Sequence, residues 1–163
     1  MIALHLLRHA HAGDPAKWRG DDADRPLSDR GVHQAELLAR LLTHAEEAPD
    51  LFITSPKVRA RQTAEILGKA LKVKVAVDPR LSGIMLELGT VTDIVLAAGH
   101  DAVRPCLVGH EPSLSDLLML ATGAAALPMR KGALARVDFP GAEALPGRGV
   151  LQYLVPPELL DKR

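Results

Sequence analysis

Residues 51–71 read LFITSPKVRARQTAEILGKAL and show how the chain is built. Leu51–Ile53 is an apolar run typical of a short buried strand. Ser55 and Pro56 follow directly, and this pair predicts a helix in which Ser55 is the N-cap and Pro56 takes the first helical position. The helix is expected to end at about Leu71. A strand followed at once by a helix is the repeating unit of a parallel sheet covered by helices.

The same alternation continues in both directions along the chain. Apolar runs predict further strands at Ile2–Leu7, Val73–Val77, Pro105–Val108, Ala133–Phe139 and Gly149–Val155. Helical spacing predicts a helix from Ser28 to about Glu47. The composition of Glu87–Ala98 predicts a second helix, and a third is expected over Leu114–Ala121. Ser28 and Ser113 are the expected N-caps of the first and last of these helices. This order predicts the α/β class, as a three-layer sandwich with a mostly parallel central sheet flanked by helices.

The composition suits one domain over residues 1–163 and disfavours several partners. Aromatic residues make up 2% of the chain, too few for a surface that stacks nucleic-acid bases. Lys and Arg number 20, as do Asp and Glu, so there is no overall basic field to attract nucleic acid or an anionic membrane. No apolar run is long enough to cross a bilayer. The single Cys106 cannot form an intramolecular disulfide, and no signal peptide follows Met1, so we expect a cytoplasmic protein.

Cationic side chains follow three of the predicted strands, at the point where each strand ends. Arg8 and His9 follow the first strand, Arg59 lies on the opening helical turn after the second, and His110 follows the strand at 105–108. Because the carboxyl ends of parallel strands meet at one edge of a sheet, we expect these four groups to converge. Guanidinium forks match phosphate oxygens, so the sequence predicts a phosphate site at this edge.

Two more residues are candidate substrate-binding groups at this edge. Ser55 is expected to cap a helix N-terminus, which would supply free N–H groups to an anion. Arg25 ends a polar segment after the first strand and is a possible additional clamp. Taken singly, each of these residues also has a purely structural interpretation, as a hydrogen-bonded histidine, a helix cap or a solvated arginine.

Four segments resemble the signature motifs of the histidine phosphatase superfamily. They are LRHA at 7–10, PLSDRG at 26–31, TSPKVRARQTA at 54–64 and VGHEP at 108–112. The short chain and the brief stretch between Thr63 and His110 resemble the small SixA-type phosphohistidine phosphatases. The resemblance implies that His9 is the nucleophile, while Arg8, Arg59 and His110 bind the phosphoryl oxygens.

The resemblance implies a phosphatase that forms a phosphohistidine intermediate, with a phosphohistidine-containing protein as the expected substrate. Because the cationic groups can compensate the phosphoryl charge, neither a metal nor another cofactor is expected. The chain departs from the pattern at Ala10, where the family has Gly. An acidic proton donor is not assigned, and Asp14, Glu87 and Glu111 are its candidates.

Other functions stay open from the sequence alone. The same residues suit a small-molecule phosphomonoesterase, a mutase-like enzyme or a phosphate-binding module without turnover. His9, His11, His110 and Glu111 could also form a metal-ligand set, although two guanidiniums nearby would repel a dication. A thiol phosphatase loop is excluded, because Pro112 stands six positions after Cys106 where that loop needs Arg.

Overall fold

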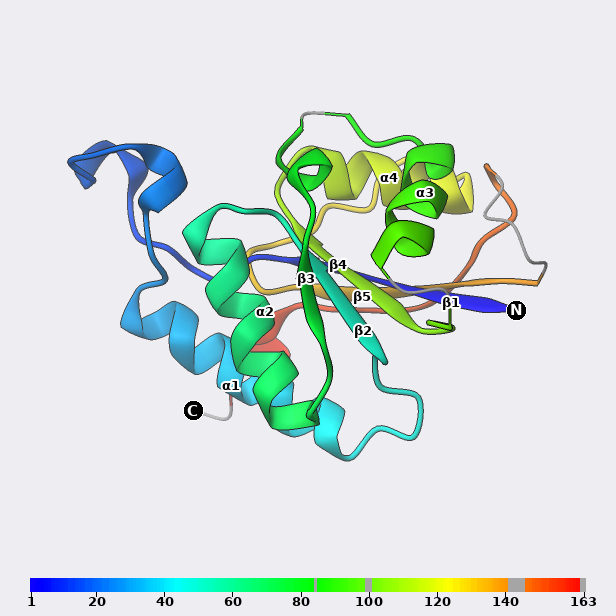
Figure 1. The fold of residues 1–163 in the computed structure, drawn as a ribbon, viewed down its shortest axis with the longest axis horizontal. Helices are drawn as coiled ribbons and strands as arrows, with labels where there is room; N and C mark the ends of the chain where they lie inside the picture. The colour runs from blue at the N-terminus through cyan, green and yellow to red at the C-terminus, as the bar shows by residue number, and fades with distance from the viewer. Residues whose placement is uncertain (84, 99–100, 141–145, 162–163) are drawn as a thin grey trace.

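The computed structural model describes residues 1–83, 85–98, 101–140 and 146–161, and it shows a mixed six-stranded sheet between two layers of helices (Figure 1). The strands are β1 (Ile2–Arg8), β2 (Leu51–Thr54), β3 (Val75–Val77), β4 (Pro105–Gly109), β5 (Leu134–Phe139) and β6 (Val150–Val155). Their order in the sheet is β3-β2-β4-β1-β5-β6. The first four in this order run parallel, β5 pairs antiparallel with β1, and β6 pairs antiparallel with β5. The predicted three-layer α/β sandwich is confirmed.

Each face of the sheet is covered by two helices. Successive side chains of a buried strand point to opposite faces, so both faces are apolar and both need a covering layer. On one face lie α1 (Asp29–Thr43) and α2 (Val58–Leu71), and on the other α3 (Leu88–Ala98) and α4 (Ser113–Thr122) (Figure 1). Leu7 packs in the core under α1 and α2, whereas its neighbour Leu6 packs in the core under α3 and α4. Among the described residues, no helix is long and apolar enough to span a membrane.

Helix starts differ from the sequence prediction at two positions. Ser28 is the N-cap of α1 as expected, since its side chain accepts the Gly31 N–H at 3.2 Å. The prediction for Ser55 was wrong: α2 begins at Val58, with Lys57 at the N-cap position and no side-chain cap. The Ser55 N–H instead donates to Val108 O at 3.0 Å, which keeps the backbone in the sheet beyond β2. Ser113 is likewise the first residue of α4 rather than its cap.

The polar segment between β1 and α1 contains two short 3₁₀ turns, Pro15–Lys17 and Asp22–Asp24. Two further 3₁₀ turns lie at Pro79–Ser82 and Pro157–Leu159. The Asp22–Asp24 turn contacts α2, so this polar segment returns to the edge of the sheet where α2 begins. That return places its side chains beside the predicted phosphate site.

Candidate active site

Four predicted residues meet at the carboxyl ends of β1, β2 and β4. Arg8 ends β1 and pairs in register with Gly109, the last residue of β4, and His9 and His110 follow directly. The two imidazole rings lie 5.1 Å apart, centre to centre. Arg59, from the first turn of α2, donates from Nε to His9 Nε2 at 3.3 Å. Because β1, β4 and β2 are adjacent parallel strands, the residues that follow them converge at one edge of the sheet, as predicted.

His9 is held as a neutral imidazole with a defined tautomer. Its Nδ1 lies 2.8 Å from the carbonyl oxygen of Ala10. A carbonyl only accepts, so the ring proton is on Nδ1 and Nε2 carries the lone pair. Burial lowers the pKa of His9 to about 3, and His110, Arg59 and Arg8 add to that effect. His9 thus presents an unprotonated Nε2, the form that a nucleophile requires.

His110 is neutral for the same reason, since burial lowers its pKa to about 3. Its Nε2 lies 2.8 Å from Ser55 Oγ, which also lies 3.0 Å from Ser82 Oγ. Its Nδ1 is buried and finds no hydrogen-bond partner among the described residues. When Ser55 donates to Nε2, the proton stands on Nδ1, and a substrate oxygen could accept it. Ser55 therefore contacts His110 rather than capping α2.

Arg8 has one satisfied and one unsatisfied side of its guanidinium. One terminal nitrogen donates to Met129 O at 2.9 Å, whereas Nε is buried without a hydrogen-bond partner among the described residues. Burial lowers the pKa of Arg8, and the nearby Glu111 opposes that shift. An unpaired buried donor is unfavourable unless a ligand completes it. An oxyanion is the ligand that this cationic donor would bind best.

Arg59 and Arg25 are joined by Asp22, a residue that the sequence analysis did not single out. Arg59 donates through its two terminal nitrogens to Asp22 O at 2.6 Å and to Asp22 Oδ2 at 2.9 Å. Arg25 donates from Nε to Asp22 Oδ1 at 2.9 Å and from a terminal nitrogen to Ala12 O at 2.6 Å. Arg25 is therefore buried beside Arg59, linked to it by one carboxylate. The only signal in the sequence was the density of Asp residues in this segment.

The candidate proton donors are occupied elsewhere. Asp14 accepts from the Ala16 N–H within its own turn. Glu111 accepts from the backbone N–H and the hydroxyl of Ser115 in the first turn of α4. Neither carboxylate hydrogen-bonds to His9 or Arg59 in the described structure, so neither is placed as a proton donor.

His11, one member of the possible metal-ligand set, faces the start of α1. Its Nδ1 lies 2.7 Å from Ser28 Oγ and accepts from the Gly13 N–H at 3.3 Å. Within the described ranges, no three His, Cys, Asp or Glu side chains are grouped as a metal site would need. The His11 side chain is therefore hydrogen-bonded at the start of α1.

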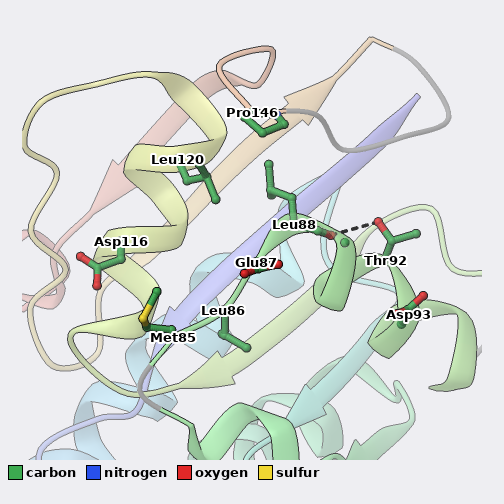
Figure 2. A pocket seen from close by; sticks show the side chains of 10 residues that line it. Met85, Leu86, Glu87, Leu88, Thr92, Asp93, Asp116, Leu120 and Pro146 are labelled. Carbon is green, nitrogen blue, oxygen red and sulfur yellow. Dashed lines mark hydrogen bonds between the residues drawn. The ribbon is translucent and has the colours of Figure 1, made fainter.

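A separate groove of about 820 Å³ lies between α3 and α4 (Figure 2). Leu86, Leu88 and Leu120 give it an apolar lining, and Figure 2 shows Asp116 on α4 and Asp93 on α3 at its sides. Glu87, the remaining candidate proton donor, also lines this groove. The acidic side chains of this groove would repel a phosphate, in contrast to the cationic groups at the strand ends.

The family model described as the histidine phosphatase superfamily (branch 1) matches residues 4–89. The chain belongs to this superfamily. The matched segment contains Arg8, His9, Arg25 and Arg59, and it is therefore the segment that carries most of the strand-end site. The chain is a phosphatase by this membership.

Three similar proteins illustrate the relationship. An uncharacterized protein of Picosynechococcus sp. is 33% identical over 120 residues, 71% of this chain and 70% of that protein. The phosphohistidine phosphatase SixA of Escherichia coli is 28% identical over 120 residues, 72% of each chain. A solved structure of the protein histidine phosphatase SixA with tungstate superposes with a TM-score of 0.80 at 23% identity, over 98% of this chain and 100% of that one. At that identity the superposition shows the shared fold.

Proposed function

We propose that this phosphatase removes the phosphoryl group from phosphohistidine on another protein, through a covalent phosphohistidine on His9. The observation that carries the proposal is the state of His9. It is neutral, its Nδ1 proton is held by Ala10, and its Nε2 lone pair lies among the guanidiniums that would bind a phosphoryl group. A buried nucleophile inside a cationic site suits attack on phosphorus.

The reaction would proceed in two balanced displacements. His9 Nε2 attacks phosphorus, its lone pair forms the new N–P bond, and the N–P bond to the substrate breaks. The substrate imidazole leaves with that electron pair. Water then attacks the phosphoryl group on His9, releases orthophosphate and returns the lone pair to Nε2. Arg8, Arg59 and the Nδ1–H of His110 would hold the non-bridging oxygens in both steps.

The choice of phosphohistidine as substrate depends on which groups near His9 could donate a proton to the leaving group. Asp22 is the carboxylate bonded to Arg59, and the hydrogen bond from Arg25 is the main cause of its lowered pKa, so it has no proton to give at neutral pH. An alkoxide leaving group would need a positioned acid. An imidazole does not, because its second ring nitrogen can be protonated near neutral pH. The relationship to SixA of Escherichia coli, a phosphohistidine phosphatase by name, supports the same choice.

The test compares three substrates with one enzyme: a protein carrying phosphohistidine, a small phosphomonoester and a phosphoglycerate. We expect kcat/KM to be highest on the phosphohistidine protein. Higher turnover on the small ester would assign a phosphomonoesterase, and isomerisation of the phosphoglycerate would assign a mutase.

The intermediate is tested by trapping. With a radiolabelled phosphodonor and an acid-free quench, label is expected on wild type and not on His9→Ala, whose circular dichroism should be unchanged. We expect His9→Ala to retain less than about one-hundredth of the wild-type rate. Turnover by wild type without any label on His9 would contradict the covalent route. Phosphate binding without turnover on any substrate would instead assign a binding module.

A further inference from the structure

Asp22 accepts hydrogen bonds from the two terminal nitrogens of the Arg59 guanidinium. Its backbone oxygen and its Oδ2 accept from the two terminal nitrogens, at 2.6 and 2.9 Å, whereas the Nε of Arg59 faces His9 Nε2 at 3.3 Å. A guanidinium is planar and offers five N–H donors in fixed directions. Two acceptors from one residue on both terminal nitrogens occupy the end of the fork. The adjoining edge, made of Nε–H and the second hydrogen of one terminal nitrogen, therefore lies toward His9.

That edge is the one a phosphoryl group on His9 would meet. In-line attack places phosphorus on the Nε2 lone pair, and its non-bridging oxygens surround that point. Arg59 can bind these oxygens in bidentate fashion, in place of its contact with His9 Nε2, only while its guanidinium plane keeps this orientation. A long side chain with free rotation would lose that orientation, so something must hold its far end.

Arg25 holds Asp22 in turn. Its Nε donates to Oδ1, the carboxylate oxygen that Arg59 does not use, and its terminal nitrogen is anchored on Ala12 O. The two arginine side chains are 9% and 6% exposed, but the Asp22 side chain is 52% exposed. The carboxylate thus lies at the mouth of the site between two buried cations.

Charge supports the same arrangement. Burial lowers the pKa of Lys131, and the charges of Arg8, Arg25 and Arg59 lower it further, so several positive groups lie near one another at this edge. Removing one carboxylate from between two of them would let Arg25 and Arg59 repel each other and turn apart. Asp22 therefore both offsets their repulsion and fixes their geometry.

We propose that Asp22 is a positioning residue for phosphoryl transfer, which holds Arg59 with its Nε edge toward the phosphoryl group on His9. This inference rests on the proposed roles of His9 and Arg59. It makes Arg25 a support of that arrangement through Asp22. It also gives the polar segment after β1 a function in the reaction, which the motif residues alone do not show.

The test is a double-mutant cycle with Asp22→Ala and Arg59→Lys, and with Asp24→Asn as the matched control. Asp24 lies in the same 3₁₀ turn, is exposed, and makes no side-chain hydrogen bond or ion pair among the described residues. Turnover of a small phosphomonoester and the Kd of vanadate are measured for each variant. Vanadate adopts the five-coordinate geometry of the transfer, so it reports the orientation of the arginine forks.

We expect Asp22→Ala to lower kcat by roughly tenfold or more while KM changes by less than about threefold, because orientation matters most in the transition state. The Kd of vanadate should rise by a similar factor, and Asp24→Asn should match wild type. In the Arg59→Lys background, Asp22→Ala should cause little further loss, since Asp22 acts through Arg59.

Three results would overturn the inference. Tighter vanadate binding in Asp22→Ala would show that Asp22 competes with the phosphoryl group. Unchanged kcat and Kd would show that Asp22 neither positions Arg59 nor competes with the phosphoryl group. Losses that multiply in the double variant would show that Asp22 has a role independent of Arg59. If Asp22→Ala does not fold, kcat and the Kd of vanadate are measured for Asp22→Asn instead, with the same expected changes. If Arg59→Lys itself changes nothing, the proposed site is wrong, which is a different failure.

Discussion

Acidification should destabilise this protein in part through His5, a histidine outside the strand-end site. His5 lies in the middle of β1 and is fully buried, with Cys106 beside it on β4 and Arg136 beside it on β5. Burial lowers the pKa of His5 to about 4, from an ordinary value of 6.5, and the charge of Arg136 adds to that effect. The folded state therefore prefers the neutral ring more strongly than the unfolded chain does.

The sign and size follow from proton linkage. A histidine whose folded pKa is depressed contributes its full stability above pH 6.5, and that contribution is lost as the pH falls from 6.5 to 4. At pH 7.5 the loss is negligible. At pH 5.0 the unfolded chain binds a proton that the folded chain does not, and the difference amounts to roughly 2 kcal/mol. His9 and His110, with pKa values of about 3, act in the same direction.

The assay is urea unfolding, followed by circular dichroism, at pH 7.5 and pH 5.0. Wild type is compared with His5→Leu, which replaces the titrating group by an apolar side chain of similar size. The variant should lose about 2 kcal/mol less stability between the two pH values than wild type does. The exposed His44 provides the control, since His44→Gln should keep the wild-type pH dependence. An equal loss in wild type and His5→Leu would refute the reasoning.

Three further outcomes are expected. Arg59→Lys should lower kcat/KM by on the order of a hundredfold, because an ammonium cannot replace a bidentate fork. Arg61 is half-exposed and paired with Glu65, so Arg61→Lys should change kcat/KM by less than about twofold. Equal losses in the two variants would mean that positive charge alone, and not the shape of the guanidinium, supports turnover. Vanadate should inhibit competitively and raise the Tm, and EDTA should leave turnover unchanged; loss in EDTA that a metal restores would favour a metal site. Gly31→Ala should destabilise by more than about 2 kcal/mol, since its Cβ would lie 1.9 Å from the backbone oxygen of His11, and a smaller change in urea unfolding would mean that the chain before α1 can shift.

Much of the fold could be predicted because it depends on local patterns. A parallel strand buried on both faces needs a nearly continuous apolar run, and the runs at β1, β2 and β4 are of this kind, with His5 as the one polar residue inside the run of β1. The rule that parallel strands present their carboxyl ends at one edge then places the residues after them together. Arg8, His9, Arg59 and His110 were predicted in this way, and the structure brings them to that edge.

The limits of the patterns are visible at Ser55. Ser followed by Pro is a common helix start, but here the Ser55 N–H pairs with Val108 on β4 and its hydroxyl contacts His110. Both partners are more than fifty residues away in the chain. A cap rule weighs only the next few residues, so it could not find that this serine belongs to the sheet edge and to a histidine.

The sequence by itself therefore determined the sandwich and the identity of the converging cations, because strand burial and strand direction follow from apolar runs and chain order. Only the tertiary structure decided the role of Asp22, one of several aspartates in a segment without periodicity. Its two guanidinium partners are three and 37 residues away, and the second reaches it only because α2 packs beside the segment. A hydrogen bond between distant buried groups depends on where the folded elements place them, and no local propensity records that position.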